Sequence, residues 1–225
     1  TNGKVCYGLN GNQSNINFYQ YLKGSDYPTL DSNYPKVLLK SSSYINPTTI
    51  TEINSKYDLL LFRDSVNAGE NYANTTININ VDIDLNSMNW TPINNINYDG
   101  ILQGNGHTIS NFTIQNQQYC GFFGRLYDNA EIHNLTLDNV TIQGSFLINN
   151  TDNISNYCGV LCGLGSNINM SNCNITNCKI DISYSTSITP SIYIGGLLGQ
   201  IYIYLNDKCK ITNCNVINLS LIHIS

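Results

Sequence analysis

The stretch that decides the fold is Tyr119–Gly144, because the chain then repeats it. It begins Tyr-Cys-Gly-Phe-Phe-Gly at 119–124 and continues as Glu-Ile-His-Asn-Leu-Thr-Leu-Asp-Asn-Val-Thr-Ile at 131–142. Two copies begin at 157 and 194, and a fainter one covers 108–116. Repeats of roughly 20–50 residues are typical of solenoids, whose units bury their apolar faces against their neighbours. The sequence therefore predicts stacked β-coils.

The aligned copies also contain two columns of asparagine. Apolar positions align at steps of 23, 38 and 41 residues, as Phe112, Leu135, Cys173 and Cys214. The first asparagine column is Asn111, Asn134, Asn172 and Asn213, and the second is Asn116, Asn139, Asn177 and Asn218. Asn tolerates left-handed backbone and its amide can bond neighbouring coils. We therefore expect two inward-facing asparagine ladders at the corners of the coil.

Composition narrows the function classes. Charged residues make up 11% of the 225 residues, and the net charge is −5. No basic patch favours nucleic acid or an anionic membrane surface, and no apolar segment is long enough to span a bilayer. The chain has no initiator Met and no signal sequence, which indicates a mature or excised piece. We expect no nucleic-acid partner and no membrane insertion by this segment.

The eight cysteines favour an oxidising compartment. Zinc ligation by Cys-x3-Cys and Cys-x4-Cys spacings is the alternative, but no histidine accompanies them, so disulfides or buried thiols are favoured. Stacked strands lie about 4.8 Å apart, within the Cα range that a disulfide accepts. The predicted pairs are Cys120–Cys158, Cys173–Cys214 and Cys178–Cys209, with Cys6 and Cys162 unassigned.

The chain divides into three parts. Residues 1–48 do not repeat, and their Tyr-Pro punctuation predicts an irregular linker with short strands that contacts the next module. Residues 49–69 predict a capping helix, with Thr49 and Glu52 as a capping box and Asn67-Ala68-Gly69 as the stop. Residues 70–225 form the predicted coils, beginning with an alternating strand at 75–86 that places Val81 on its inward face.

Several motifs together resemble a known family. They are Val-Asn-Ala-Gly at 66–69, Asp-Ile-Asp-Leu at 82–85, Trp-Thr-Pro-Ile at 90–93, Gly-Asn-Gly-His-Thr-Ile-Ser-Asn at 104–111 and the repeated Gly-Phe-Phe-Gly and Gly-Gly-Leu-Leu-Gly phrases. Over about residues 50–225 the chain resembles the GLUG-motif β-helix repeats of adhesins and secreted repeat proteins. The resemblance implies an all-β solenoid, a right-handed parallel β-helix with one short capping α-helix. It implies a structural or adhesive role and no catalytic residues.

An enzyme of the polysaccharide-degrading β-helix type is a remote alternative. Hydrolysis requires two opposed carboxylates, and β-elimination requires a base with clustered acids for Ca²⁺. Asp82 and Asp84 share one strand face and are better explained as solvated carboxylates than as a weak Ca²⁺ site. His107, His133 and His223 have no recognisable partner in the sequence. We predict no enzyme activity, no cofactor and no metal.

Sequons for N-glycosylation are dense and indicate passage through a secretory pathway. Those expected to be modified are Asn12, Asn74, Asn89, Asn149, Asn153, Asn169 and Asn174. Those in the ladder columns, expected to be too buried, are Asn111, Asn134, Asn139 and Asn218.

The expected function is a structural module of a secreted or cell-surface tandem-repeat fibre or coat, N-glycosylated and associating end to end with adjacent copies. Residues 1–50 and 210–225 are the expected contacts between copies. The alternative is an adhesin that binds glycans or a host protein. Its candidate platform consists of Tyr184, Tyr193, Tyr202 and Tyr204.

Overall fold

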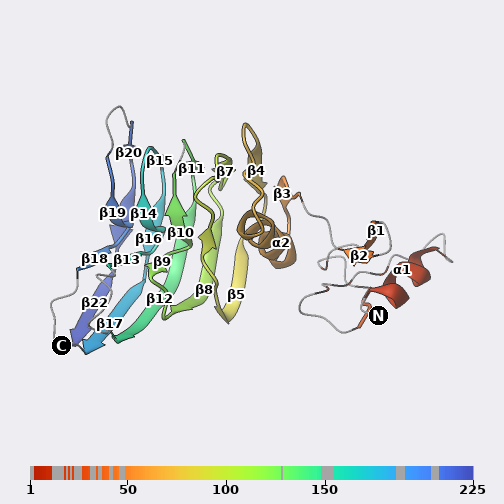
Figure 1. Ribbon diagram of the computed structural model, residues 1–225, viewed down its shortest axis with the longest axis horizontal. Coiled ribbons are helices and arrows are strands. Elements are labelled where there is room, and N and C mark those ends of the chain that lie inside the picture. Colours follow the sequence, from red (N-terminus) through yellow and green to blue (C-terminus); the bar gives the residue numbers. More distant parts are fainter. Residues whose placement is uncertain are drawn as a thin grey trace.

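The computed structural model describes residues 3–11, 18, 20, 22, 27–30, 34, 37–40, 43–45, 49–127, 129–147, 155–185, 191–203 and 208–224. Helix α1 (Lys4–Gly11) and the antiparallel pair β1 (Leu38–Lys40) and β2 (Ser43–Ile45) come first. Helix α2 (Lys56–Asn67) follows, and the remaining strands are stacked from α2 toward the C-terminus (Figure 1).

Four parallel sheets make up the stack. One contains β6 (Ile93–Asn94), β10 (Phe123–Leu126), β14 (Cys162–Gly165) and β19 (Leu198–Ile201). A second contains β3 (Glu52–Ile53), β4 (Thr76–Ile79), β7 (Ile101–Gln103), β11 (Glu131–His133), β15 (Asn169–Ser171) and β20 (Lys210–Thr212). A third contains β5 (Ile83–Asn89), β8 (Thr108–Gln115), β12 (Thr136–Leu147), β16 (Asn174–Thr176), β17 (Lys179–Ser185), β21 (Asn215–Ile217) and β22 (Ser220–Ile224). The fourth contains β9 (Tyr119–Cys120), β13 (Asn156–Gly159) and β18 (Ile192–Gly195).

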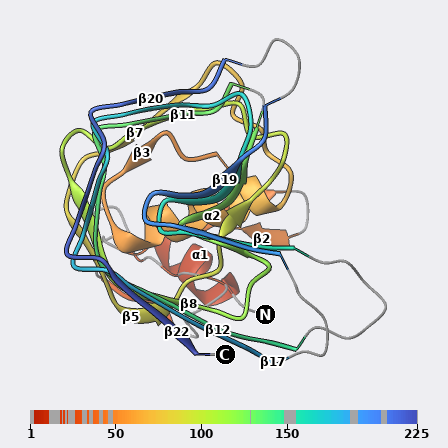
Figure 2. The ribbon, with the colours of Figure 1, turned by 90° about the vertical axis from the view of Figure 1, so that its left-hand side faces the viewer.

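The predicted fold class, an all-β solenoid in the form of a right-handed parallel β-helix with one short capping helix, is therefore wrong. The described residues form four separate parallel sheets, an antiparallel pair and two helices. Turn residues divide each repeat copy into short strands, and each strand pairs with the equivalent strand of the next copy. The repeat thus determines parallel pairing between copies, as in the register Ile132–Met170–Ile211. Figure 2 shows these copies overlapping when viewed from the C-terminal side.

Helix α2 begins later than predicted. Its N-cap is Ser55, whose hydroxyl accepts a hydrogen bond from the Asp58 amide at 3.2 Å. Thr49 precedes the helix, and Glu52 lies in β3 instead of the first turn, because residues 52–53 pair with β4. The helix stops where predicted, with Ala68 as C-cap and Gly69 at φ 112°. Gly tolerates that conformation at no steric cost.

The predicted continuous strand at 75–86 is also wrong, because the chain turns a corner at Asn80–Asp82. Strand β4 belongs to the second sheet and β5 to the third. Val81 therefore lies outside the core and is 37% exposed. Its alternation with Ile79 and Ile83 predicted burial, but a corner reverses the face that a side chain presents.

The core lies between the sheets and is closed at one end by α2. Trp90 stacks on Phe122 with ring centroids 4.9 Å apart and donates its indole N–H to the Phe122 carbonyl at 3.0 Å. Leu59, Phe62 and Val66 of α2 are fully buried, and the helix contacts edge strands β3, β5 and β6. An amphipathic helix over sheet edges protects them from further strand pairing.

The glycines of the repeated phrase allow the copies to approach closely. A Cβ on Gly159 would lie 2.5 Å from the Gly199 backbone nitrogen of the next copy. Backbone cannot move aside as a flexible side chain can, so only glycine fits there. Gly106 has φ 83°, in the left-handed region that favours glycine.

Candidate functional site

The asparagine ladders exist, but their register and orientation differ from the prediction. Asn111 donates no bond to the Asn134 column; instead Asn139 donates to Asn111 at 2.6 Å, 28 residues away. Phe112 correspondingly pairs with Val140, so the strands pair five residues further along than the alignment of Phe112 with Leu135 predicted. The later register is as predicted, with Asn172 donating to Asn134 at 2.9 Å and Asn218 to Asn177 at 3.1 Å.

All of these ladder residues have left-handed backbone, with φ between 51° and 58°. None is buried: Asn139, Asn172, Asn177 and Asn218 are exposed and Asn111 and Asn134 are half-buried. The expected inward placement is wrong because the side chain at a left-handed corner points along the outside of the stack. The ladders join copies at the surface and do not form the core.

The sequons differ in whether the amide nitrogen is already bonded. Asn74 and Asn89 are exposed, and no described residue accepts a hydrogen bond from either amide. The side-chain nitrogen of Asn169 donates to the Glu131 carboxylate at 3.0 Å. The side-chain oxygen of Asn174 accepts from the side-chain nitrogen of Asn215 at 3.0 Å. The remaining predicted sites, Asn12, Asn149 and Asn153, lie outside the described residues.

In the second group of sequons, the amide nitrogens are donors within the ladders. Asn111 donates to Asp84 and Asn134 to Gln103, at 3.0 and 2.8 Å. Asn139 donates to Asn111 of the other predicted column, and Asn218 donates to Asn177 of its own column. All four side-chain nitrogens are therefore bonded, as that of Asn169 also is, and none of the four residues is buried.

All eight cysteines are free thiols in this structure. Two predicted pairs do lie at neighbouring register positions. Cys120 pairs directly with Cys158. Asn174 pairs with Asn215, and Cys173 and Cys214 are the residues directly before them. Disulfides at these two places remain predictions. The Cys178–Cys209 pairing conflicts with the register, because Cys178 adjoins β17 and Cys209 adjoins β20 in another sheet.

The carboxylates on β5 and the turn before it are structural. Asp82 accepts hydrogen bonds from the Thr108 amide and shares one with His107, and Asp84 accepts from the Asn86 amide. These hydrogen bonds lower the pKa of both carboxyl groups. Within the described part of the chain no group of three His, Cys, Asp or Glu is arranged to hold a metal ion.

Sequence reasoning missed the partners of His133. Its Nδ1 lies 2.7 Å from the Ser171 hydroxyl and its Nε2 lies 2.7 Å from Glu131. The order resembles a nucleophile, a base and an orienting acid. However, the amide of Asn172, directly after the serine, donates to the Thr212 carbonyl at 3.0 Å and cannot stabilise an oxyanion. The arrangement is therefore better explained as a row of polar contacts between adjacent strands. The side chain of the third predicted histidine, His223, lies outside the described part of the structure.

The C-terminal end of the stack is open. Met170, Ile175 and Ile180 are at most 1% exposed, but their partners in the last copy, Ile211, Val216 and Leu221, are 38%, 42% and 60% exposed. Strands β18, β19, β20 and β22 are the last members of their sheets. An open edge with apolar side chains is a template for pairing with another chain.

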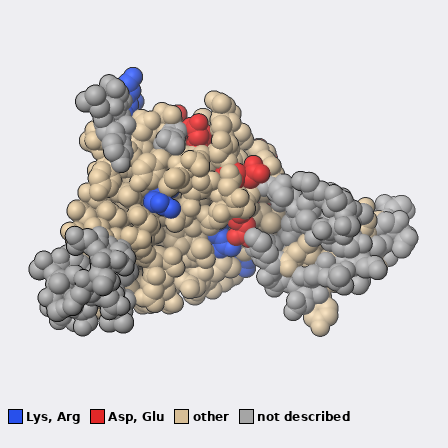
Figure 3. All heavy atoms as spheres, in the orientation of Figure 1, with Lys and Arg blue, Asp and Glu red and all other residues tan. Residues whose placement is uncertain are grey.

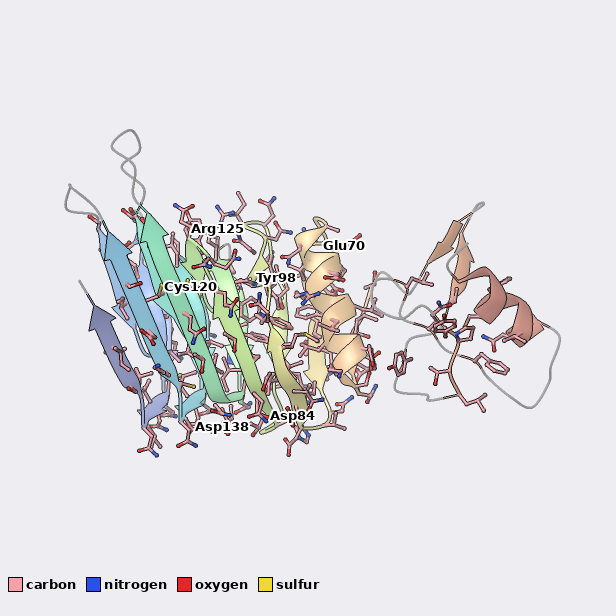
Figure 4. All side chains as sticks on the ribbon, turned by 90° about the horizontal axis from the view of Figure 1, so that it is seen from below. Glu70, Asp84, Tyr98, Cys120, Arg125 and Asp138 are labelled. Carbon is pink, nitrogen blue, oxygen red and sulfur yellow. The ribbon has the colours of Figure 1, made fainter. Side chains whose placement is uncertain are left out.

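A cleft of about 580 Å³ lies beside α2, between the first and the fourth sheet. It is lined by Asn67, Thr91, Pro92, Asn94, Gln117, Gln118, Tyr119 and Arg125. Figure 4 shows Arg125 at the outer edge of the stack, while Asp84 and Asp138 lie at the opposite edge. Charged groups are sparse on the face shown in Figure 3.

Of the four tyrosines predicted to form an adhesin platform, the structure describes the side chains of Tyr193 and Tyr202. Tyr193 stacks on Tyr157 with ring centroids 5.2 Å apart, and Tyr157 stacks on Tyr119 at 5.4 Å. Tyr202 is 41% exposed. The side chain of Tyr184 and the whole of Tyr204 are outside the described part of the structure.

No family model, curated protein or solved structure matches this chain. In the described residues no helix is long and apolar enough to cross a membrane.

Proposed function

We propose that the protein is a structural module of an extracellular tandem-repeat fibre or surface coat, in which copies associate end to end. The open end formed by β18–β22 is the observation that carries this proposal. The apolar positions of each earlier copy are covered by the copy that follows, whereas no described residue covers the equivalent positions of the copy at 192–224. A further copy of the same repeat would supply both apolar contacts and parallel strand partners.

The asparagine ladder supports the same partner. Asn218 donates its amide to Asn177, and its own carbonyl oxygen has no donor among the described residues. In the preceding copy the equivalent side-chain oxygen, that of Asn177, accepts from Asn218. An added copy with asparagine at the same register would extend the ladder.

The end covered by α2 differs, because the helix covers edge strands β3, β5 and β6. Strand addition is therefore proposed at the open end. Residues 210–224 belong to the open end, and the contribution of residues 1–50 to the contact stays part of the proposal. Secretion and N-glycosylation belong to the same proposal and are supported by the sequons with unbonded amides at Asn74 and Asn89.

The test is the mass of the full chain in solution. We expect a dissociation constant in the micromolar range, which corresponds to about −8 kcal/mol. Light scattering at roughly 100 μM protein should therefore show dimers or larger species. Val216→Lys with Leu221→Lys should yield monomers, since two charges would be buried at the contact. Ile96→Lys is the matched control, because Ile96 is 45% exposed and lies outside the open end. A wild-type monomer at this concentration would refute the proposal.

A further inference from the structure

We propose that the cleft at Arg125 binds a carboxylate-bearing saccharide. The site is separate from the open end, so it does not depend on self-association. It is formed by α2, β6, β9, β10 and the turns next to them, and Arg125 is the one charged residue in its lining.

The guanidinium of Arg125 is held in place before any ligand binds. Its Nε donates to the Asn94 side-chain oxygen at 2.7 Å, and its plane lies over the Tyr119 ring at 4.7 Å. Asn94 is itself fixed, because its backbone amide donates to Asn67 at 2.7 Å. These contacts use the Nε and one face of the group.

The two terminal nitrogens of Arg125 remain available. No described residue accepts a hydrogen bond from them, and no acidic residue lines the cleft. A guanidinium fork with both terminal nitrogens free matches a carboxylate in bidentate geometry. The chain has 15 acidic and 10 basic side chains, so acidic partners for Arg125 are in excess, yet none lines this cleft.

The rest of the lining indicates a saccharide instead of an acidic peptide. The side-chain nitrogen of Gln117 donates a hydrogen bond to the backbone carbonyl of Gln115, and that of Gln118 donates to the backbone carbonyl of Ser155, each at 3.2 Å. Both amides are thereby oriented with their oxygens left as acceptors, and Thr91 adds a hydroxyl. Sugar hydroxyl groups donate to such acceptors, and a saccharide carries several of them close to its carboxylate, whereas the backbone of an acidic peptide offers one N–H donor per residue. About 580 Å³ is within the usual range for a small-molecule site.

The experiment is an NMR titration of the full chain with methyl glucuronide, using methyl glucoside as the neutral match. We expect a Kd of roughly 0.1–10 mM for the glucuronide, as is reasonable for a ligand of this size. The glucoside should bind at least about tenfold more weakly, because it lacks the carboxylate. Arg125→Met should weaken glucuronide binding by about tenfold or more, and Arg125→Lys by a smaller factor, because lysine has no planar fork.

Lys208→Met is the matched control, because it removes one positive charge from an exposed residue outside the cleft and should leave the Kd unchanged. Equal binding of glucuronide and glucoside would overturn the proposal, as would unchanged binding by Arg125→Met. N-acetylglutamate that binds as tightly as glucuronide would also overturn it, since the site would then select carboxylates and not saccharides. The comparison of ligands on the wild-type chain decides the matter even if Arg125→Met does not fold.

Discussion

Replacing Asn177 by alanine should destabilise the protein through its left-handed backbone and through its side-chain hydrogen bonds in about equal measure. Asn177 has φ 52°, and a left-handed conformation costs a residue with a Cβ about 1–2 kcal/mol. Its side chain also donates to Asp138 at 2.8 Å and accepts from Asn218 at 3.1 Å. Each bond contributes about 0.5–1.5 kcal/mol, with exposed bonds at the lower end. We expect Asn177→Ala to lower the free energy of unfolding by about 2–4 kcal/mol.

A glycine at the same position separates the two contributions. Asn177→Gly loses the same hydrogen bonds but adopts the left-handed conformation without strain, so its loss should be about 1–2 kcal/mol. Asn80→Ala is the control, because Asn80 donates to Glu52 and Asn54 but is not among the residues with positive φ. Its loss should be about 1 kcal/mol.

Urea and thermal unfolding followed by circular dichroism measure these differences. For a chain of this length 1 kcal/mol corresponds to about 2–4 °C in Tm, so Asn177→Ala should melt roughly 4–16 °C below the wild type. Equal losses for the alanine and glycine variants would show that the left-handed backbone does not contribute. A loss below about 0.5 kcal/mol for alanine would refute the reasoning altogether.

Three further predictions follow from burial and bonding. Ile175→Ala should lower the free energy of unfolding by about 2–5 kcal/mol, because Ile175 is fully buried. Val216→Ala at the paired position should lower it by less than about 1 kcal/mol in the monomer, because Val216 is exposed. Urea midpoints measure both losses, and similar losses would mean that Val216 is covered. Burial raises the pKa of Cys178 to about 11 from 9.0, so the unfolded chain releases this proton first and stability should fall as pH rises from 9 toward 11; Cys178→Ala should flatten that part of a urea-midpoint profile. In a glycosylating host, peptide mapping should find a glycan on Asn74 and none on Asn134, whose amide donates to Gln103; the reverse occupancy would contradict this.

Much of the stack could be predicted from the repeat. Copies of one phrase bury the same columns, so the register of Ile132 with Met170 and of Ile175 with Val216 follows from the alignment. The left-handed corners at Asn134 and Asn177 were also predictable, because asparagine tolerates that conformation better than most residues.

The first copy shows where alignment fails. It was aligned through Asn111 with Asn134, whereas the strands pair Asn111 with Asn139. The two asparagine columns are five residues apart and look alike in sequence. Only the pairing of β8 over its full length with the first part of β12, which includes Phe112 with Val140, distinguishes them.

By itself, the sequence determined which residues pair between copies and which residues form corners, because these depend on local conformation and on a periodic apolar pattern. Only the tertiary structure decided that the strands form four separate sheets, that α2 covers one end while Leu221 at the other is exposed, and that Arg125 meets Asn94 and Asn67 at a cleft. The physical reason is that these features depend on turn angles and on contacts between residues about 30–60 positions apart, which no local pattern records.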